Sequence, residues 1–246
     1  MLAPDRSFAH LGPMPVKHAE IAVPDFRHVD AWIFDLDNTL YRADSDLFAQ
    51  IDARMCDFVS RLLNVPPEEA KRIQKEYYRD HGTTLNGLIK RHNIDPESFL
   101  AFVHDIDLSV LAPDVALNDA IARLPGKRYV FTNGCRNYAT RVLERVGLKD
   151  SIDALFDIRA IRYSPKPEMA AYRTVLAAAG TAPECCAMFE DVARNLVPAH
   201  ELGMTTVWLN NGSVWSKQGP EFPVAGAQHI DYETTDLNAF LRSIRI

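Results

Sequence analysis

The sequence predicts an α/β fold in which a doubly wound parallel sheet carries an inserted all-helical segment. After residue 113, short apolar runs typical of buried strands alternate with helical patterns, and this alternation indicates a parallel sheet with helices on both faces. Residues 45–112 contain several helical patterns and no convincing strand. The length of 246 residues suits one core domain with a sizeable insertion.

The first convincing element is the apolar run over residues 29–34, which ends abruptly at Asp35. It is short and rich in residues that favour strands, so it fits a strand buried on both faces. The residues before it contain four prolines without helical or strand periodicity. The predicted domains are therefore a loosely ordered lead-in over residues 1–25, a core of residues 26–44 and 113–246, and a helical cap over residues 45–112.

Helical spacing of apolar residues defines the elements of the insertion. Pro66 and Pro67 end the first helical pattern, and Pro67 can open the second. The expected helices of the cap cover residues 47–62, 67–78, 84–91 and 96–104.

The second half of the chain supplies the rest of the sheet. Further strands are expected over residues 128–131, 155–161, 186–189 and 205–209. Helices are expected up to Leu124, over residues 138–146, up to Gly180, before Gly203 and after Asp236.

Bulk composition excludes several classes of function. The net charge is −6 without a basic cluster, which disfavours a nucleic-acid polymer as partner but leaves room for a small anionic ligand. The four cysteines form no disulfide or metal pattern, so reduced thiols in a cytoplasmic protein are expected. No secretory signal and no membrane-spanning apolar stretch is visible, and a membrane partner is not expected. No pattern indicates an oligomeric state.

Polar residues follow three of the predicted strands. Asp35 and Asp37 follow the first strand, Thr132-Asn133-Gly134 follows the next core strand, and Glu190-Asp191 follows the strand over residues 186–189. Ligands of open α/β sheets bind outside the carboxyl ends of the strands. These clusters are therefore expected to converge on one edge of the sheet.

Such carboxylates have a coherent chemistry if they share one site. One can attack an electrophile and form a covalent intermediate, while a second, two residues on, exchanges protons with the leaving group and with water. Asp191 as a third carboxylate would let the site hold Mg²⁺, which prefers one or two carboxylates with waters and substrate phosphate. An Asp-x-Asp pattern alone is weak evidence for a functional site, because the same pattern recurs at Asp44/Asp46 and Asp105/Asp107.

Thr132 and Lys166 are ambiguous when taken singly. Thr132 suits a strand end or a cap, and Lys166 can be a surface residue before Pro167, which is expected to open a helix. If both residues act with the carboxylates in one site, the Thr132 hydroxyl binds a phosphate oxygen, and Lys166 neutralises charge on Asp35 and the phosphoryl group.

Four motifs in order resemble those of the haloacid dehalogenase-like hydrolase superfamily. They are Asp35-Leu36-Asp37-Asn38-Thr39-Leu40-Tyr41, Thr132-Asn133-Gly134, Lys166-Pro167, and Glu190-Asp191 with Asn195. The resemblance implies that Asp35 is the nucleophile and Asp37 the general acid/base. It also implies that Thr132 and Lys166 bind phosphate, with help from Asn133.

The same resemblance implies a set of Mg²⁺ ligands. Asp35 and Asp191 would ligate the ion directly, and Asp37 would offer its backbone carbonyl. Glu190 would lie in or near the metal shell. Asn195 stands where other members carry an aspartate, which would place less charge behind the metal.

The 94 residues between Asp37 and Thr132 resemble the type with a helical cap between the first and second motifs. The stretches over residues 76–88 and 103–107, together with the Asp-Asn-Thr-Leu-Tyr form of the first motif, look like the pyrimidine 5′-nucleotidase branch. The implied substrate is a pyrimidine nucleoside 5′-monophosphate. Tyr41, Tyr78 and Arg136 are candidate substrate-binding residues.

Several alternatives remain open. The substrate can be another small phosphorylated metabolite, such as a sugar phosphate or phosphoglycolate, and a phosphomutase fits the same motifs. A haloacid dehalogenase shares the nucleophile, but releasing halide requires neither the acid Asp37 nor a metal at Asp191. A phospho-accepting receiver domain is shorter and lacks the insertion. A binding protein without catalytic activity would not need all the polar residues of the four motifs.

Overall fold

The computed structural model describes residues 23–213 and 227–246. Their six strands form a single sheet with the order β3-β2-β1-β4-β5-β6, and every neighbouring pair is parallel. The predicted doubly wound α/β class is confirmed. Most of the expected lead-in, residues 1–22, lies outside the described residues. The strands are β1 (Ala31–Phe34), β2 (Lys127–Phe131), β3 (Ala154–Phe156), β4 (Cys186–Glu190), β5 (Thr205–Leu209) and β6 (Tyr232–Thr234).

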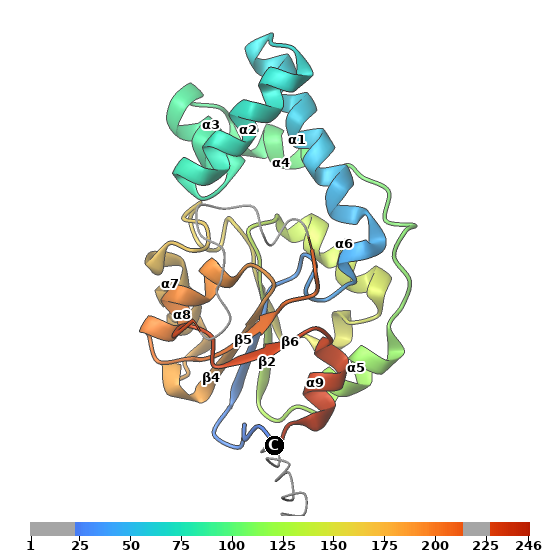
Figure 1. Ribbon diagram of the computed structural model, residues 1–246, viewed down its shortest axis with the longest axis vertical. Coiled ribbons are helices and arrows are strands. Elements are labelled where there is room, and N and C mark those ends of the chain that lie inside the picture. Colours follow the sequence, from blue (N-terminus) through green and yellow to red (C-terminus); the bar gives the residue numbers. More distant parts are fainter. Residues whose placement is uncertain (1–22, 214–226) are drawn as a thin grey trace, which may run out of the picture.

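Helices cover both faces of this sheet. In Figure 1, α7 and α8 lie on one side, and α5, α6 and α9 lie on the other. The core-packed helices are α5 (Val115–Ala122), α6 (Arg136–Val146), α7 (Met169–Ala179), α8 (Val197–Glu201) and α9 (Leu237–Ser243). Short 3-10 turns occupy Ala43–Ser45, Lys149–Ser151, Pro183–Cys185 and Ala193–Leu196. No helix in the described part of the chain is both long and apolar enough to cross a bilayer.

The four helices between β1 and α5 form a separate group, which we call the α1–α4 layer. It consists of α1 (Leu47–Leu63), α2 (Pro67–His81), α3 (Thr84–His92) and α4 (Pro96–Val103), and it lies beyond one end of the sheet (Figure 1). As expected from the sequence, no strand occurs in residues 45–112, all of which are described.

Local signals explain where these helices begin and end. The Thr83 side chain accepts the Asn86 N–H at the start of α3, and the Asp95 carboxylate accepts the N–H groups of Glu97 and Ser98 at the start of α4. Asn64 ends α1 with φ of 52°, a left-handed conformation that asparagine tolerates better than most residues.

Strand register aligns the polar clusters. Phe34, the last residue of β1, pairs with Val130 of β2 and Phe189 of β4. The residues that follow these positions therefore emerge at the same level, and the Asp35 N–H donates to the Phe189 carbonyl over 2.9 Å. The stacked rings of Phe34 and Phe189, 4.8 Å apart, fix the two central strands just below this edge.

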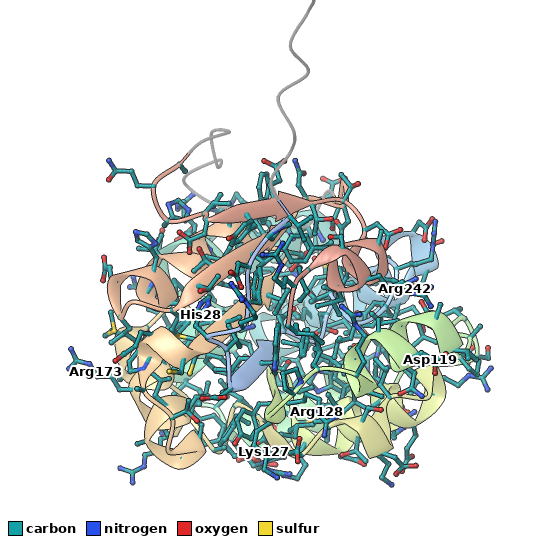
Figure 2. The ribbon with its side chains drawn as sticks, turned by 90° about the horizontal axis from the view of Figure 1, so that it is seen from below. His28, Asp119, Lys127, Arg128, Arg173 and Arg242 are labelled. Atoms are coloured by element: carbon teal, nitrogen blue, oxygen red, sulfur yellow. The ribbon has the colours of Figure 1, made fainter. Side chains whose placement is uncertain are left out.

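The opposite end of the sheet is shown in Figure 2, where Lys127 and Arg128 begin β2. The Lys127 Nζ and Arg128 Nε atoms lie 2.9 Å and 3.2 Å from the Asp153 carboxylate. These three charged side chains therefore pair with each other, while the carboxyl ends of the strands face the α1–α4 layer (Figure 1).

Some element boundaries differ from the sequence-based prediction. The strand expected over residues 155–161 ends at Phe156, because the Asp157 carboxylate accepts the N–H groups of Arg136 and Ala160 and turns the chain. Pro167 does not open a helix, since α7 begins at Met169. The edge strand β6 was not predicted, because its half-exposed residues lack an apolar run.

Candidate active site

Lys166 and Asp35 form the centre of the candidate site. The Lys166 Nζ atom donates to Asp35 Oδ1 over 2.5 Å, to Glu190 Oε2 over 2.7 Å and to the Phe131 carbonyl over 3.0 Å. The lysine is only 2% exposed. Burial lowers the pKa of Lys166, but the Asp35 and Glu190 carboxylates outweigh it and raise that pKa above its ordinary value. The ammonium group therefore stays charged between two carboxylates.

Asn133 holds the backbone of this lysine. Its Oδ1 atom accepts the Lys166 N–H over 2.9 Å, and its Nδ2 atom donates to the Lys166 carbonyl over 3.2 Å. Asn133 also lines the cavity of the site. The side chain predicted to assist at the phosphate thus ties the second motif to the third, a role that the sequence did not reveal.

Thr132 is fully buried, and its Oγ1 atom accepts the Gly134 N–H over 2.9 Å. Among the residues that line the cavity are Asn133 and Gly134, but not Thr132. A Cβ atom at Gly134 would lie 3.1 Å from Tyr138 Cδ1 and 3.3 Å from Thr132 Oγ1. A side chain at Gly134 would therefore push against both neighbours of the site.

Asp37 is held differently from Asp35. Its Oδ1 atom accepts hydrogen bonds from the Tyr138 hydroxyl over 2.6 Å and from the Tyr41 hydroxyl over 2.8 Å. Burial and the neighbouring Asp35 carboxylate raise the pKa of Asp37 to about 6, although the two hydroxyls act in the opposite direction. A carboxyl group with such a pKa can both give and take a proton near neutral pH.

Glu190 and Asp191 complete a buried acidic cluster at the end of β4. Burial, followed by the Asp35 charge, raises the pKa of Glu190 to about 7. Burial, followed by Glu190, raises the pKa of Asp191 well above its usual range. One lysine does not balance the charge of this cluster, which therefore favours either a bound proton or an added cation.

The donor set fits a hard divalent cation. Carboxylate oxygens of Asp35, Glu190 and Asp191 lie within 4.8 Å of one another, and the buried Asp191 Oδ2 atom has no hydrogen-bond partner. Oxygen ligands of this kind suit Mg²⁺. Asp35 and Asp191 could hold such an ion with Glu190 beside them. One oxygen each of Asp35 and Glu190 accepts a hydrogen bond from Lys166.

Mg²⁺ is expected to raise the melting temperature by about 5–10 °C at a hundredfold excess over its Kd, because binding only the folded state stabilises it. Asp191→Asn should remove this Mg²⁺-dependent shift in melting temperature. It should not destabilise the metal-free protein, because burial beside other carboxylates makes a charged Asp191 unfavourable there. Differential scanning calorimetry with Mg²⁺ and with EDTA measures both effects. The exposed Asp105→Asn is the control, and an unchanged Mg²⁺ shift in Asp191→Asn would contradict this assignment.

A cavity of about 170 Å³ separates the core from the α1–α4 layer. Asp35, Asp37 and Asp191 line it from the core, and Tyr78 lines it from α2. The Arg194 guanidinium lies 4.2 Å from the centre of the Tyr78 ring. Of the predicted substrate-binding residues, Tyr78 thus reaches the cavity.

The other two candidate substrate-binding residues lie elsewhere. The Tyr41 hydroxyl donates a hydrogen bond to Asp37 Oδ1. Arg136 is exposed at the start of α6, and its guanidinium donates to the Leu155 carbonyl over 2.7 Å. Neither residue is among those that line the cavity. Tyr138, by contrast, was not among the predicted site residues, although it contacts Asp37 directly.

His104 supports Tyr138 from the end of α4. Their rings stack with centroids 4.4 Å apart and an angle of 7° between planes, and the His104 Nδ1 atom lies 3.2 Å from Cys135 Sγ. Burial lowers the pKa of His104 from 6.5 to about 4. The imidazole is therefore neutral in the folded protein at neutral pH.

His104 is expected to make stability depend on pH. Because its folded pKa lies below the unfolded value, its contribution is complete above pH 6.5 and is lost as the pH falls towards 4, by about 3 kcal/mol. Urea unfolding between pH 4 and pH 7 should show a smaller loss in His104→Asn than in the wild type. The same change at the exposed His92 should leave the dependence in place, and equal slopes for wild type and His104→Asn would refute the prediction.

Comparisons with known proteins place this geometry in a family context. A family model described as haloacid dehalogenase-like hydrolase matches residues 29–203. Phosphate metabolism protein 8 from Saccharomyces cerevisiae is 29% identical over an alignment of 166 residues that covers 61% of this chain and 50% of that protein. The chain therefore spans about half the length of this curated relative.

Solved structures show the same fold at low identity. A HAD phosphatase from Thermococcus onnurineus has a TM-score of 0.58 at 21% identity, covering 89% of this chain and 100% of its own. The magnesium-bound putative HAD-hydrolase YfnB from Bacillus subtilis has a TM-score of 0.56 at 17% identity, covering 89% and 99%. L-2-haloacid dehalogenase from Xanthobacter autotrophicus has a TM-score of 0.54 at 18% identity, covering 87% and 97%. Because phosphatase and dehalogenase share this fold, the choice between them depends on the site.

Proposed function

Because the chain belongs to the haloacid dehalogenase-like hydrolase family, we propose that it is a Mg²⁺-dependent phosphatase of small phosphate monoesters. Its substrates would be pyrimidine nucleoside 5′-monophosphates. We further propose that residues 45–112 act as a cap over the core and that the protein works in the cytoplasm, where its four cysteines stay reduced.

The observation that carries the proposal is the different environment of two carboxylates only two residues apart. Asp35 lies against the Lys166 ammonium at 2.5 Å, so a cation sits beside the carboxylate that would act as the nucleophile. Asp37 is bonded to two tyrosine hydroxyls, and its pKa rises to about 6. A dehalogenase needs the first group but has no use for the second as an acid, so the pair favours phosphate ester hydrolysis.

In the proposed reaction, an Asp35 oxygen attacks phosphorus and the ester oxygen leaves with the proton of Asp37. Asp37 then removes a proton from water, whose oxygen attacks the aspartyl-phosphate and regenerates Asp35. Lys166 stabilises the negative charge throughout. Mg²⁺, when bound, would supply charge neutralisation between the anionic nucleophile and the phosphate. The α1–α4 layer would exclude bulk water and select the leaving group.

The relatives give further support to phosphate chemistry. The yeast relative is named as a phosphate metabolism protein, and the Thermococcus structure is described as a phosphatase. The Bacillus structure holds magnesium. These names support the class of reaction, while the nucleotide specificity rests on the sequence resemblance.

Phosphate release from a substrate panel tests the proposal. The panel contains nucleoside monophosphates, sugar phosphates and phosphoglycolate, each with Mg²⁺ and with EDTA. Metal-dependent release favouring UMP and CMP is expected. Preference for a sugar phosphate or phosphoglycolate would support the phosphatase reaction but contradict the proposed nucleotide substrate. Halide release from a haloacid without phosphate release would favour dehalogenase activity.

Tyr138→Phe is expected to slow hydrolysis according to the leaving group. With UMP, whose alkoxide must be protonated, kcat/KM should fall about 10- to 100-fold because Asp37 loses one of its orienting hydroxyls. The constant kcat/KM is compared because it reports the first step, whereas the second step uses Asp37 as a base for both esters. With 4-nitrophenyl phosphate, whose phenolate leaves without a proton, the change should stay within about threefold. Tyr172→Phe is the matched control, since this buried hydroxyl donates to the Asn195 carbonyl instead. Equal losses on both esters would refute the orienting role.

A further inference from the structure

A buried polar cluster lies in the α1–α4 layer, on the wall of the same cavity. Asp52 of α1 and Gln74 and Lys75 of α2 all line it. The Asp52 carboxylate accepts hydrogen bonds from Gln74 Nε2 over 2.8 Å and from Lys75 Nζ over 2.9 Å, and it also accepts one from Lys71 Nζ. Asp52 is 6% exposed and Gln74 is 2% exposed.

Asp52 fixes the orientation of the Gln74 amide. Burial raises the pKa of Asp52, but the hydrogen bonds from Lys71 and Lys75 outweigh it and lower that pKa overall. An ionised carboxylate only accepts hydrogen bonds, so the Gln74 NH₂ group must face it. The remaining amide oxygen, Gln74 Oε1, is buried and has no hydrogen-bond partner. Buried acceptors are nearly always satisfied in folded proteins, so this oxygen points to a missing donor.

The rest of the cavity wall in the layer is largely apolar. Besides the core carboxylates and the polar cluster, the lining includes Phe48, Ile51, Met55, Phe99, Leu100 and Val103. A ligand whose phosphate lies at Asp35 and which fills this cavity would thus contact apolar side chains as well as the polar cluster. Nucleobases combine apolar faces with N–H donors on their edge, whereas a short carboxylic or sugar phosphate does not.

We infer that Gln74, oriented by Asp52, forms a subsite that accepts a hydrogen bond from a ring N–H or amino group of the nucleobase in the leaving group. This inference rests on the proposed phosphatase function and specifies which part of the substrate the α1–α4 layer recognises. The donor satisfies Gln74 Oε1, and the ring covers the apolar wall. Uracil and cytosine both carry such a donor.

The test compares UMP and CMP with the 5′-monophosphate of pyrimidin-2-one riboside, which keeps the ring but has no N–H donor. Wild-type kcat/KM is expected to be about 10-fold higher for UMP and CMP, the effect of one hydrogen bond. Gln74→Met should reduce this ratio to within about twofold, because UMP and CMP lose their hydrogen-bond acceptor. Gln50→Met is the matched control, because Gln50 bonds to the Asp107 backbone elsewhere in the layer.

Calorimetric binding of uridine and of pyrimidin-2-one riboside gives a second readout that needs no hydrolysis. Tighter binding of uridine in the wild type, lost in Gln74→Met, supports the subsite even if no ester is hydrolysed, in which case only the proposed phosphatase function fails. Hydrolysis without preference for a donor-bearing base overturns the subsite and leaves the phosphatase intact. Equal losses of UMP and ribose 5-phosphate turnover in Gln74→Met also overturn it, as does failure of uridine to bind.

Discussion

Replacing Asp35 by asparagine is expected to lower kcat for phosphate monoesters by about 10⁴-fold or more, because the amide cannot serve as the attacking nucleophile. The fold should persist. An asparagine of the same size can still accept the hydrogen bond from Lys166 through its oxygen. Its NH₂ group would replace Asp35 Oδ2, which accepts from Thr39 Oγ1 over 3.2 Å, and could donate to that hydroxyl instead. Single-turnover phosphate release with UMP and Mg²⁺, together with circular dichroism, measures activity and folding in the same preparation.

The control for this variant is Asp105→Asn, which changes a carboxylate with 83% of its side chain exposed and should retain full activity. A second check uses acid quenching with ³²P-labelled substrate. Wild-type protein should retain label as an acyl phosphate, and Asp35→Asn should not. A folded Asp35→Asn variant with normal turnover would rule out the proposed covalent mechanism.

The sequence was sufficient to predict the sheet and the convergence of its polar clusters. Apolar runs such as residues 31–34 and 186–189 are buried on both faces, and this burial leaves a clear pattern in composition. Parallel strands then oblige Asp35, Thr132 and Glu190 to emerge at one edge. By contrast, β6 lies at the edge of the sheet with half-exposed residues, so its sequence carries little signal.

The contacts that tune the site could not be predicted in the same way. Tyr138 reaches Asp37 across 101 residues of sequence, and this contact depends on how α6 packs against the sheet. The Gln74 contact with Asp52 likewise depends on the packing of α2 against α1. Arg136 was predicted to bind substrate and is close to the second motif in sequence. Its side chain instead donates to the Leu155 carbonyl and does not line the cavity. Strand ends follow from local pattern, whereas side-chain pairs between elements follow from tertiary packing.

Replacing Lys166 by methionine is expected to lower the free energy of unfolding by about 3–5 kcal/mol, because the buried Asp35 and Glu190 carboxylates lose the cation between them. The kcat for UMP should also fall, by about 10³-fold, since the charge on the phosphoryl group is no longer balanced. Urea unfolding in EDTA isolates the effect on stability from any contribution of metal. Lys149→Met is the control, because its pair with Glu144 is exposed on both sides and surface pairs contribute at most about 1 kcal/mol.

A second substitution separates the loss of charge from the loss of packing. Adding Glu190→Gln to Lys166→Met removes one of the two uncompensated carboxylates, so the double variant should recover part of the lost stability. Its activity should stay low, because the neutral amide introduced by Glu190→Gln does not restore a cation beside Asp35. A loss of less than about 1 kcal/mol in Lys166→Met, or no recovery in the double variant, would mean that the buried carboxylates do not need the Lys166 cation and would contradict its proposed role beside Asp35.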